Sequence, residues 1–244
     1  TKGTYDFTLD TFESYSSFEK NSTEARHSTT SVSFAIKIPE VFELGFNYND
    51  MKYKKYVQKM RHYSGTTHSF IRAHSRLEVA QYMLKPKDLM LHPEFLQRIR
   101  ALPLQYSYGE YRQIYSDYGT HYITEATLGG EYEYTIVLNK ENIEKSGYSL
   151  SDTKKCVQVG LKVGANIEGV YYTLGGEGGS CKGLLKELGD SKVERKFVED
   201  FVAVVKGGGS ESITRLAFKQ LPTPEIMQEW GDSVFYNPDF LHSK

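Results

Sequence analysis

The sequence predicts an α+β fold, and three observations carry that prediction. The chain of 244 residues is long enough to bury a core of its own. Its composition, with 19 Tyr, 13 Phe and 21 Gly, favours strands and glycine turns over a helix bundle. Stretches in which apolar and polar residues alternate are interrupted by segments that open with helix start signals.

The first part of the chain contains three candidate strands. Residues 4–12 alternate between apolar and polar types, the pattern of a half-buried strand. A polar stretch covers residues 14–30, and alternation returns over residues 32–48 with an interruption at Pro39. A longer strand is expected over residues 68–84, where apolar and charged residues are mixed.

Two helices are expected next. Pro93 suits the first position of a helix. Ser107 and Glu110 have the spacing of a capping box, which predicts a second helix start. The residues that recur at helical spacing after it, and that predict a face packed in the core, are Tyr111, Ile114, Tyr115 and Tyr118.

Strands dominate the segments that follow. A long strand is expected over residues 121–138, and Gly129-Gly130 within it indicates a bend, a bulge or a close backbone approach. Over residues 157–173, odd positions are apolar and even positions are polar or glycine, an alternation much longer than the usual strand of about 5–6 residues. A further strand over residues 201–205 ends at Gly207–Gly209.

Two helices are expected at the end of the chain. Ile213, Leu216, Ala217 and Leu221 share one helical face. Thr223-Pro224 is a cap followed by proline at the first helical position.

The charge balance excludes binding through an overall field. The 30 Lys and Arg residues face 31 Asp and Glu residues, so nucleic acid and anionic lipid are not attracted by the molecule as a whole. The basic stretch over residues 52–61 is interpreted as a solvated face, with local contact to nucleic acid or lipid headgroups as the alternative. No run approaches the ~20 apolar residues of a membrane helix, and no secretory leader opens the chain. We expect a soluble chain or the mature part of one.

Cysteine usage and one sequon favour a secreted protein. Cys156 and Cys181 are too few and too far apart for a zinc finger or a redox pair, so one disulfide is the better interpretation, with two buried thiols as the alternative. Asn21-Ser22-Thr23 is an N-glycosylation sequon in a polar stretch. Together these features favour an oxidising, extracellular setting.

The sequence does not predict an enzyme. His121 and Glu125 have no second ligand or base at a suitable spacing, so neither a catalytic nor a metal site is expected. The glycines of residues 174–179 lack the ending of a phosphate-binding loop, so no cofactor site is expected.

One spacing carries a family resemblance. Tyr111 is followed after six residues by Tyr118-Gly119-Thr120-His121-Tyr122 and after six more by Gly129-Gly130. This pattern resembles the signature of the membrane attack complex/perforin family, and the stretch Glu229–Ser233 also resembles a family motif. Within the family, segments such as Leu77–Ala80 are most similar to a complement member.

The resemblance implies a fold. The expected architecture is a bent, twisted four-stranded antiparallel sheet with flanking helices and two helical-cluster inserts, shared with the cholesterol-dependent cytolysins. Residues 1–244 would form a single domain that is incomplete at its C-terminal end. The first insert would cover residues 14–65 and the second insert residues 140–192.

The resemblance also implies a function. A complement subunit of this family would dock onto a nascent membrane attack complex and refold its inserts into membrane hairpins. Its expected partners are other terminal complement components, including the alpha and gamma chains of the eighth component and the preceding membrane-bound complex, and the lipid membrane. In a spanning strand one face meets lipid, and the residues expected there are Val157, Val159, Leu161, Val163, Ala165, Ile167 and Tyr171. The alternative is a non-lytic docking module whose inserts stay helical.

Two structural roles complete these expectations. Gly129, Gly130 and Gly207–Gly209 would form a hinge between two strands, with a static bulge as the alternative, and a Gly130→Val change would spare soluble folding. His121 would be structural, at a junction where Gly119 ends a helix with a positive φ.

Overall fold

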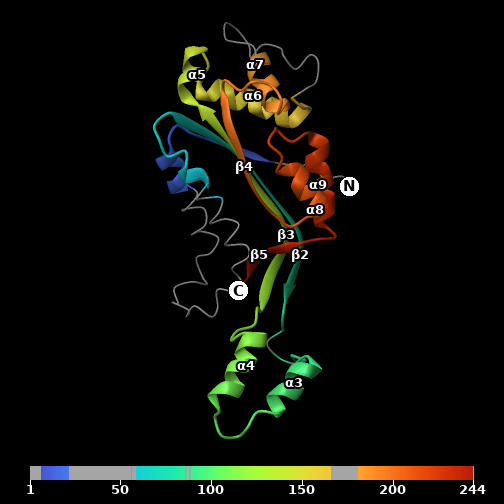
Figure 1. Ribbon diagram of the computed structural model, residues 1–244. Coiled ribbons are helices and arrows are strands. Elements are labelled where there is room, and N and C mark those ends of the chain that lie inside the picture. The colour runs from blue at the N-terminus through green and yellow to red at the C-terminus, as the bar shows by residue number, and fades with distance from the viewer. Residues whose placement is uncertain are drawn as a thin grey trace.

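The computed structural model has an antiparallel five-stranded sheet at its centre (Figure 1). It describes residues 7–21, 56, 59–85, 87, 89–165 and 181–243. The order along the sheet is β1-β2-β3-β4, and β5 also pairs with β3. The strands are β1 (Thr8–Phe12), β2 (His68–Met83), β3 (Glu125–Asn139), β4 (Val198–Lys206) and β5 (Asp239–Ser243).

Four of these strands match the expected sheet, and the fifth was not predicted. β4 pairs with β3 from Glu131 to Leu138, and β5 continues along the same strand from Ala126 to Gly129. β5 therefore occupies the part of β3 that β4 leaves unpaired. The strand expected over residues 32–48 lies outside the described residues.

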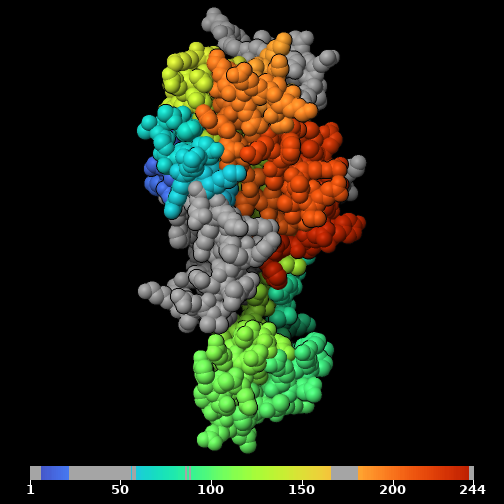
Figure 2. Space-filling model, in the orientation of Figure 1, coloured from blue at the N-terminus to red at the C-terminus, as the bar shows by residue number. Residues whose placement is uncertain are grey.

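A lobe of two helices lies beyond one end of the sheet, below the ends of β2 and β3 in Figures 1 and 2. It consists of α3 (Pro93–Arg100) and α4 (Tyr108–Tyr118). Ser107 is the N-cap of α4, but its side chain makes no capping hydrogen bond, so the predicted capping box is wrong. The predicted core face is also wrong, because only Ile114 of α4 is buried. The two helices pack on each other, away from the sheet, and the tyrosines stay partly in water.

Three helices of the second insert lie at the opposite end of the sheet (Figure 1). They are α5 (Lys140–Lys145), α6 (Leu150–Val163) and α7 (Lys182–Gly189). Ser149 and Asp152 form a complete capping box at the start of α6. The helical cluster expected for this insert is therefore present, and the alternating residues 157–163 are helical in this state.

Two further helices cover one face of the sheet, and a smaller aromatic cluster covers the other. α8 (Ser210–Leu216) and α9 (Pro224–Val234) flank β3 and β4 (Figure 1). Thr223 caps α9 by accepting from the Ile226 N–H at 3.2 Å, as predicted. Trp230 of α9 is completely buried in the main core with Tyr132 and Tyr134 of β3. Among the helices in the described ranges, none combines the length and apolarity needed to cross a membrane.

Candidate functional site

The candidate site is the sheet face that carries the described part of the first insert. Opposite residues on antiparallel strands point to the same face, and the register places Asp10 beside Arg72, Arg72 beside Thr135 and His74 beside Glu133. These residues form a polar track along the middle of the face. We call it the polar track and define it as Asp10, Arg72, His74, Glu131, Glu133 and Thr135.

Apolar contacts hold the first insert beside this track. Residues 15–21 are helical, and Phe18 is 2% exposed. Its ring stacks on Phe70 of β2 at 5.4 Å between centroids and meets Phe12 of β1 edge-on at 5.5 Å. Met60 is fully buried in the same cluster. Among the described residues the cluster contains eight buried side chains, far fewer than the main core, so the described part of this insert is attached by a small apolar contact.

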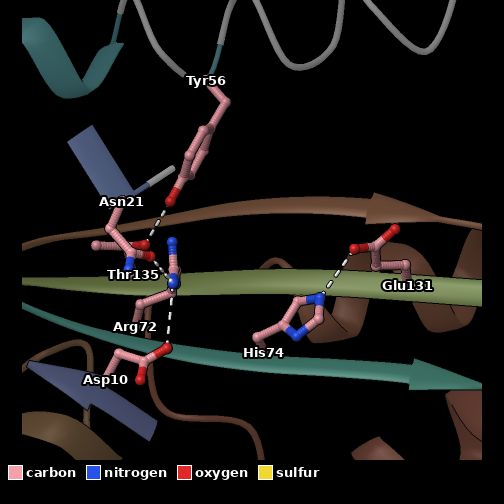
Figure 3. Close-up of polar contacts among 7 residues, drawn as sticks. All are labelled: Asp10, Asn21, Tyr56, Arg72, His74, Glu131 and Thr135. Atoms are coloured by element: carbon pink, nitrogen blue, oxygen red, sulfur yellow. Dashed lines mark hydrogen bonds and ion pairs between the residues drawn. The ribbon is translucent and has the colours of Figure 1, made fainter. Parts of the chain in front are cut away.

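Arg72 is the most buried charge of the polar track. The residue is 6% exposed, and its Nη2 donates to Asp10 Oδ2 at 3.1 Å and to Asn21 Oδ1 at 2.6 Å (Figure 3). Its guanidinium also lies 5.1 Å from the ring centroid of Phe12. A buried charge is tolerated only when it is paired in this way. Arg72 therefore ties the end of helix 15–21 to β1 and β2.

Two tyrosines of the first insert complete the attachment. The Tyr56 hydroxyl is hydrogen-bonded to the Thr135 hydroxyl on β3 (Figure 3). The Tyr63 hydroxyl donates to Asp200 Oδ2 on β4 at 2.5 Å. The pKa of Tyr63 is raised, first by burial and then by the hydrogen bond to Asp200 and the charges of Asp200 and Glu199.

Farther along the track, His74 Nε2 lies 2.8 Å from Glu131 Oε1 (Figure 3). Burial alone raises the pKa of Glu131, but the hydrogen bond from His74 and the charges of Lys206 and Arg76 outweigh it, so the net shift is downward. Glu131 is therefore held in its ionised form.

The second insert is attached differently. The disulfide between Cys156 and Cys181 joins α6 to the start of α7, and both cysteines are buried in the main core. Glu187 of α7 is 4% exposed, and its carboxylate accepts from three consecutive backbone N–H groups, of Lys196, Phe197 and Val198. These donors lie at the start of β4. The insert is thus fixed to the sheet by a buried carboxylate as well as by packing.

The predicted hinge glycines lie together where β4 leaves the sheet. Gly207 and Gly208 have φ values of 70° and 94°. A Cβ on Gly207 would lie 2.4 Å from the Gly129 carbonyl oxygen, and one on Gly130 would lie 2.6 Å from Val234 Cγ2. The Trp230 indole N–H donates to the Gly207 carbonyl at 3.0 Å. Of the alternatives for Gly129-Gly130, the structure shows a close backbone approach together with a bulge or irregularity in the pairing, where the register shifts on β2 between Glu78 and Ala80.

This packing corrects one expectation. A Gly130→Val change would not spare soluble folding, because its side chain would collide with Trp230 and Val234, which are both fully buried. Gly209 is different, since nothing lies closer than 3.7 Å to a Cβ placed there.

The comparisons with known proteins address the whole chain. The model of the MAC/Perforin domain family matches residues 1–244. The chain belongs to the membrane attack complex/perforin family. A relative named complement component C8 beta chain, from Oncorhynchus mykiss, is 60% identical over 243 residues, and that of Oryctolagus cuniculus is 47% identical over 244 residues. Both alignments cover 100% of this chain and 41% of the relative.

A more distant relative is the complement component C8 alpha chain of Oryctolagus cuniculus. It is 31% identical over 190 residues, which cover 75% of this chain and 31% of that relative. The predicted resemblance to the membrane attack complex/perforin family, and within it to a complement member, is confirmed.

The membrane attack complex/perforin signature is divided between two places. Most of its residues lie in or just after α4, namely Tyr111, Tyr118, Gly119, Thr120, His121 and Tyr122. Gly129 and Gly130 lie in β3, beside Gly207. Gly119 ends α4 with a φ of 77°, as expected. Thr120 Oγ1 and His121 Nδ1 are 2.8 Å apart, so the His121 ring is hydrogen-bonded beside that helix end. Gly119 and Gly130 of the signature thus occupy a helix end and a tightly packed position, whereas Tyr122 is 66% exposed.

The residues expected to face lipid do not form one face in the helical state. Val157 and Leu161 are buried, Ala165 is 7% exposed and Val163 is 45% exposed. Ile167 and Tyr171 lie outside the described residues, as does most of the basic stretch 52–61. Asn21 is exposed at the end of helix 15–21.

Sequence reasoning missed the polar attachments of both inserts, and Arg72 and Glu187 show why. Arg72 and Glu187 read as ordinary charges in a strand and a helix, because their partners are 62, 51, 9, 10 and 11 residues away in the chain. One signal was present for Glu187, since it follows Leu184 and Leu185 at the spacing of their buried face.

Proposed function

We propose that this chain is the pore-complex domain of a terminal complement subunit. It docks onto a nascent membrane attack complex on a target membrane and contributes β-hairpins from its two inserts to the pore wall. The observation that carries the proposal is the match of the whole chain to the family, together with 60% identity to a complement component C8 beta chain. The chain spans 41% of that relative, so this role concerns one part of a longer protein.

The attachments of the inserts support this role. The described part of the first insert rests on a small aromatic cluster and on polar contacts made by Arg72, Thr135 and Asp200. Contacts of this kind can be replaced by water without exposing the main core. Departure of the first insert would therefore leave β2, β3 and β4 intact and extend the sheet toward the membrane.

The partners and the setting follow from the same proposal. The expected partners are the alpha and gamma chains of the eighth component, the preceding membrane-bound complex and a lipid membrane. The protein is secreted, carries a glycan on Asn21 and acts without catalysis or a cofactor. The disulfide between Cys156 and Cys181 fits an oxidising compartment.

A non-lytic docking module is the second candidate, and one observation favours it. The α3–α4 lobe and the segments before and between its helices expose large apolar side chains, among them Met90 at 97%, Leu104 at 107% and Tyr108 at 66%. Exposed apolar surface of this kind marks contact sites between proteins. In that case the lobe binds partners and the inserts remain helical.

Dye release from liposomes tests the proposal. The chain, in its full-length protein, is added to liposomes that carry the preceding complement complex, with or without the later components. We expect no leakage from the isolated protein, because a single hairpin leaves two unpaired strand edges in lipid. Leakage is expected when all components are present. The docking module would be favoured if substitutions in the two inserts left both the assembly of the complex and the amount of dye release unchanged.

A further inference from the structure

One cluster of metal-ligating side chains has no role in the proposed function. His74 of β2 lies directly opposite Glu133 of β3, and Glu131 lies two residues along β3 on the same face. One ligand atom from each of these three residues lies within 4.8 Å of the others. The sequence shows no ligand pattern for this cluster, because its members come from two strands that pair only in the fold.

A second observation concerns Glu133 alone. Its Oε2 atom is buried and has no hydrogen-bond partner. A buried carboxylate oxygen without a donor is costly, and a cation bound to it would remove that cost. His74 and Glu131 already approach each other at 2.8 Å, so the open coordination lies on the Glu133 side of the cluster.

The surrounding charges leave room for a cation. Arg76 and Lys206 lie opposite Glu131 in the register of β2 and β4. Arg76 Nε also lies 3.2 Å from Glu78 Oε1, so the Arg76 guanidinium is shared between the carboxylates of Glu131 and Glu78. Among these described residues, the three carboxylates of Glu131, Glu133 and Glu78 face the two cations of Arg76 and Lys206, which leaves one negative charge without a counter-charge in this group.

We propose that His74, Glu131 and Glu133 bind a zinc ion. One imidazole nitrogen and two carboxylate oxygens form a mixed ligand set that suits Zn²⁺, which usually takes four ligands in a tetrahedron. Calcium and magnesium instead take about six or more oxygen ligands, and the cluster does not supply them. Water would complete the zinc coordination. Because the sheet ladder fixes both strands, the three ligands are held near one another before the ion binds.

The ion would also have a structural effect. It would join β2 to β3 two residues beyond Arg72, on the face that carries the first insert. This inference does not depend on the proposed function, since it concerns binding to the isolated chain.

Zinc titration of the purified protein tests the site. The bound metal is measured by equilibrium dialysis for the wild type and for the His74→Gln, Glu133→Gln and His92→Gln variants. We expect one ion per chain in the wild type and an affinity at least tenfold weaker in the first two variants. His92→Gln removes an exposed imidazole that lies outside the cluster, so it should bind as the wild type does.

Three results of the dialysis with zinc would overturn the proposal. They are the absence of stoichiometric zinc binding, unchanged affinity in both cluster variants, and an equal loss in His92→Gln, which would indicate adventitious binding to surface histidines. If a cluster variant fails to fold, X-ray absorption of the zinc-loaded wild type decides the question. The site requires one imidazole and otherwise oxygen ligands, and any other set contradicts it. Calcium is the control ion, and saturation of the same residues by calcium in place of zinc would also contradict the assignment.

Discussion

Gly207 shows how a single missing Cβ shapes the centre of the molecule. Its φ of 70° is unfavourable for any other residue, and a Cβ there would meet the Gly129 carbonyl oxygen at 2.4 Å. The obstacle is backbone, which cannot rotate away. Trp230 then fits over the junction and donates to the Gly207 carbonyl. The close approach of β3 and β4 at this point therefore depends on glycine.

This geometry gives the first prediction. Gly207→Ala should lower the free energy of unfolding by about 2 kcal/mol or more, because it combines an unfavourable backbone angle with a collision. Gly209→Ala is the control, since a Cβ has room there and φ is -70°. Urea unfolding of both variants measures the difference. Equal midpoints would show that the junction tolerates side chains.

Tyr63 gives a second prediction at this scale. Tyr63→Phe should lower the free energy of unfolding by about 1.5–3 kcal/mol, since Asp200 is buried and would lose a donor to its charged group. The exposed Tyr122→Phe is the control. The raised pKa of Tyr63 keeps the phenol neutral in the folded state. Its contribution is therefore complete below the ordinary tyrosine pKa of about 10 and is lost as pH rises through the raised value. A Tyr63→Phe protein as stable as the wild type at neutral pH would contradict this.

The sequence predicted some single-residue roles and missed others for a physical reason. The end of α4 at Gly119 and the cap at Thr223 follow from local backbone chemistry, which neighbouring residues reveal. The disulfide followed from the cysteine count. Arg72 owes its role to Asp10 and Asn21, which approach it only after the strands pair. No local pattern records that approach.

At the scale of elements, α6 carries two patterns in one stretch. Its buried residues are Thr153, Cys156, Val157, Gly160 and Leu161. That spacing is helical, yet the odd positions from 157 onward also alternate as in a strand. In the folded chain the helical pattern prevails, because α6 has a capping box and a disulfide to the start of α7. The alternation remains available to a strand only if this helix unfolds.

Glu187 gives a prediction for the attachment of α7. Glu187→Gln replaces one acceptor oxygen by an amide that faces backbone donors, so we expect a loss of about 1.5–3 kcal/mol. Hydrogen exchange at the start of β4 should accelerate, since the N–H groups of Phe197 and Val198 lose their acceptor. The matched control is Glu194→Gln, which is exposed. Unchanged exchange at these amides would mean that packing alone holds the insert.

The predicted burial of a helix was wrong where its amphipathic pattern did not specify which element would pack on it. The tyrosine stripe of α4 is apolar enough to predict core burial, but α4 packs on α3 in a lobe beyond the sheet. A helical pattern records that a face is apolar and does not record how much surface will cover it. β5 was missed for the opposite reason, because five residues that pair with one short part of β3 give little signal.

At the scale of the whole molecule, the sheet is long and its attachments lie at different places along it. The lobe of α3 and α4 occupies one end, α5 to α7 the other, and the described part of the first insert rests on the side of the sheet opposite α8 and α9 (Figure 1). The sheet, its antiparallel order and the helical cluster of the second insert were predictable, because strand alternation and the family signature are carried by the sequence itself. The polar track was not, since it exists only across paired strands.

The central claim is that the alternating stretch of the second insert becomes a membrane strand after assembly. Val163 has the parity assigned to lipid and Gln158 the parity assigned to the lumen, and both are exposed in α6, so a label at either site starts in water. Both cysteines of this chain are joined in the disulfide, so single Val163→Cys and Gln158→Cys variants add one free thiol to it that can be labelled with an environment-sensitive dye.

The emission of each labelled protein, measured before and after complete complexes assemble on liposomes, tests this claim most directly. A dye at residue 163 should move to an apolar environment, and one at residue 158 should remain in water, because faces alternate along a spanning strand. The same alternation predicts the effect of a charge. Val163→Lys should make insertion of the strand less favourable by about 2–4 kcal/mol near the bilayer midplane and suppress leakage, whereas Gln158→Lys should leave leakage unchanged. Identical responses at 163 and 158, whether both apolar or both aqueous, would contradict the membrane strand and favour a module that stays folded.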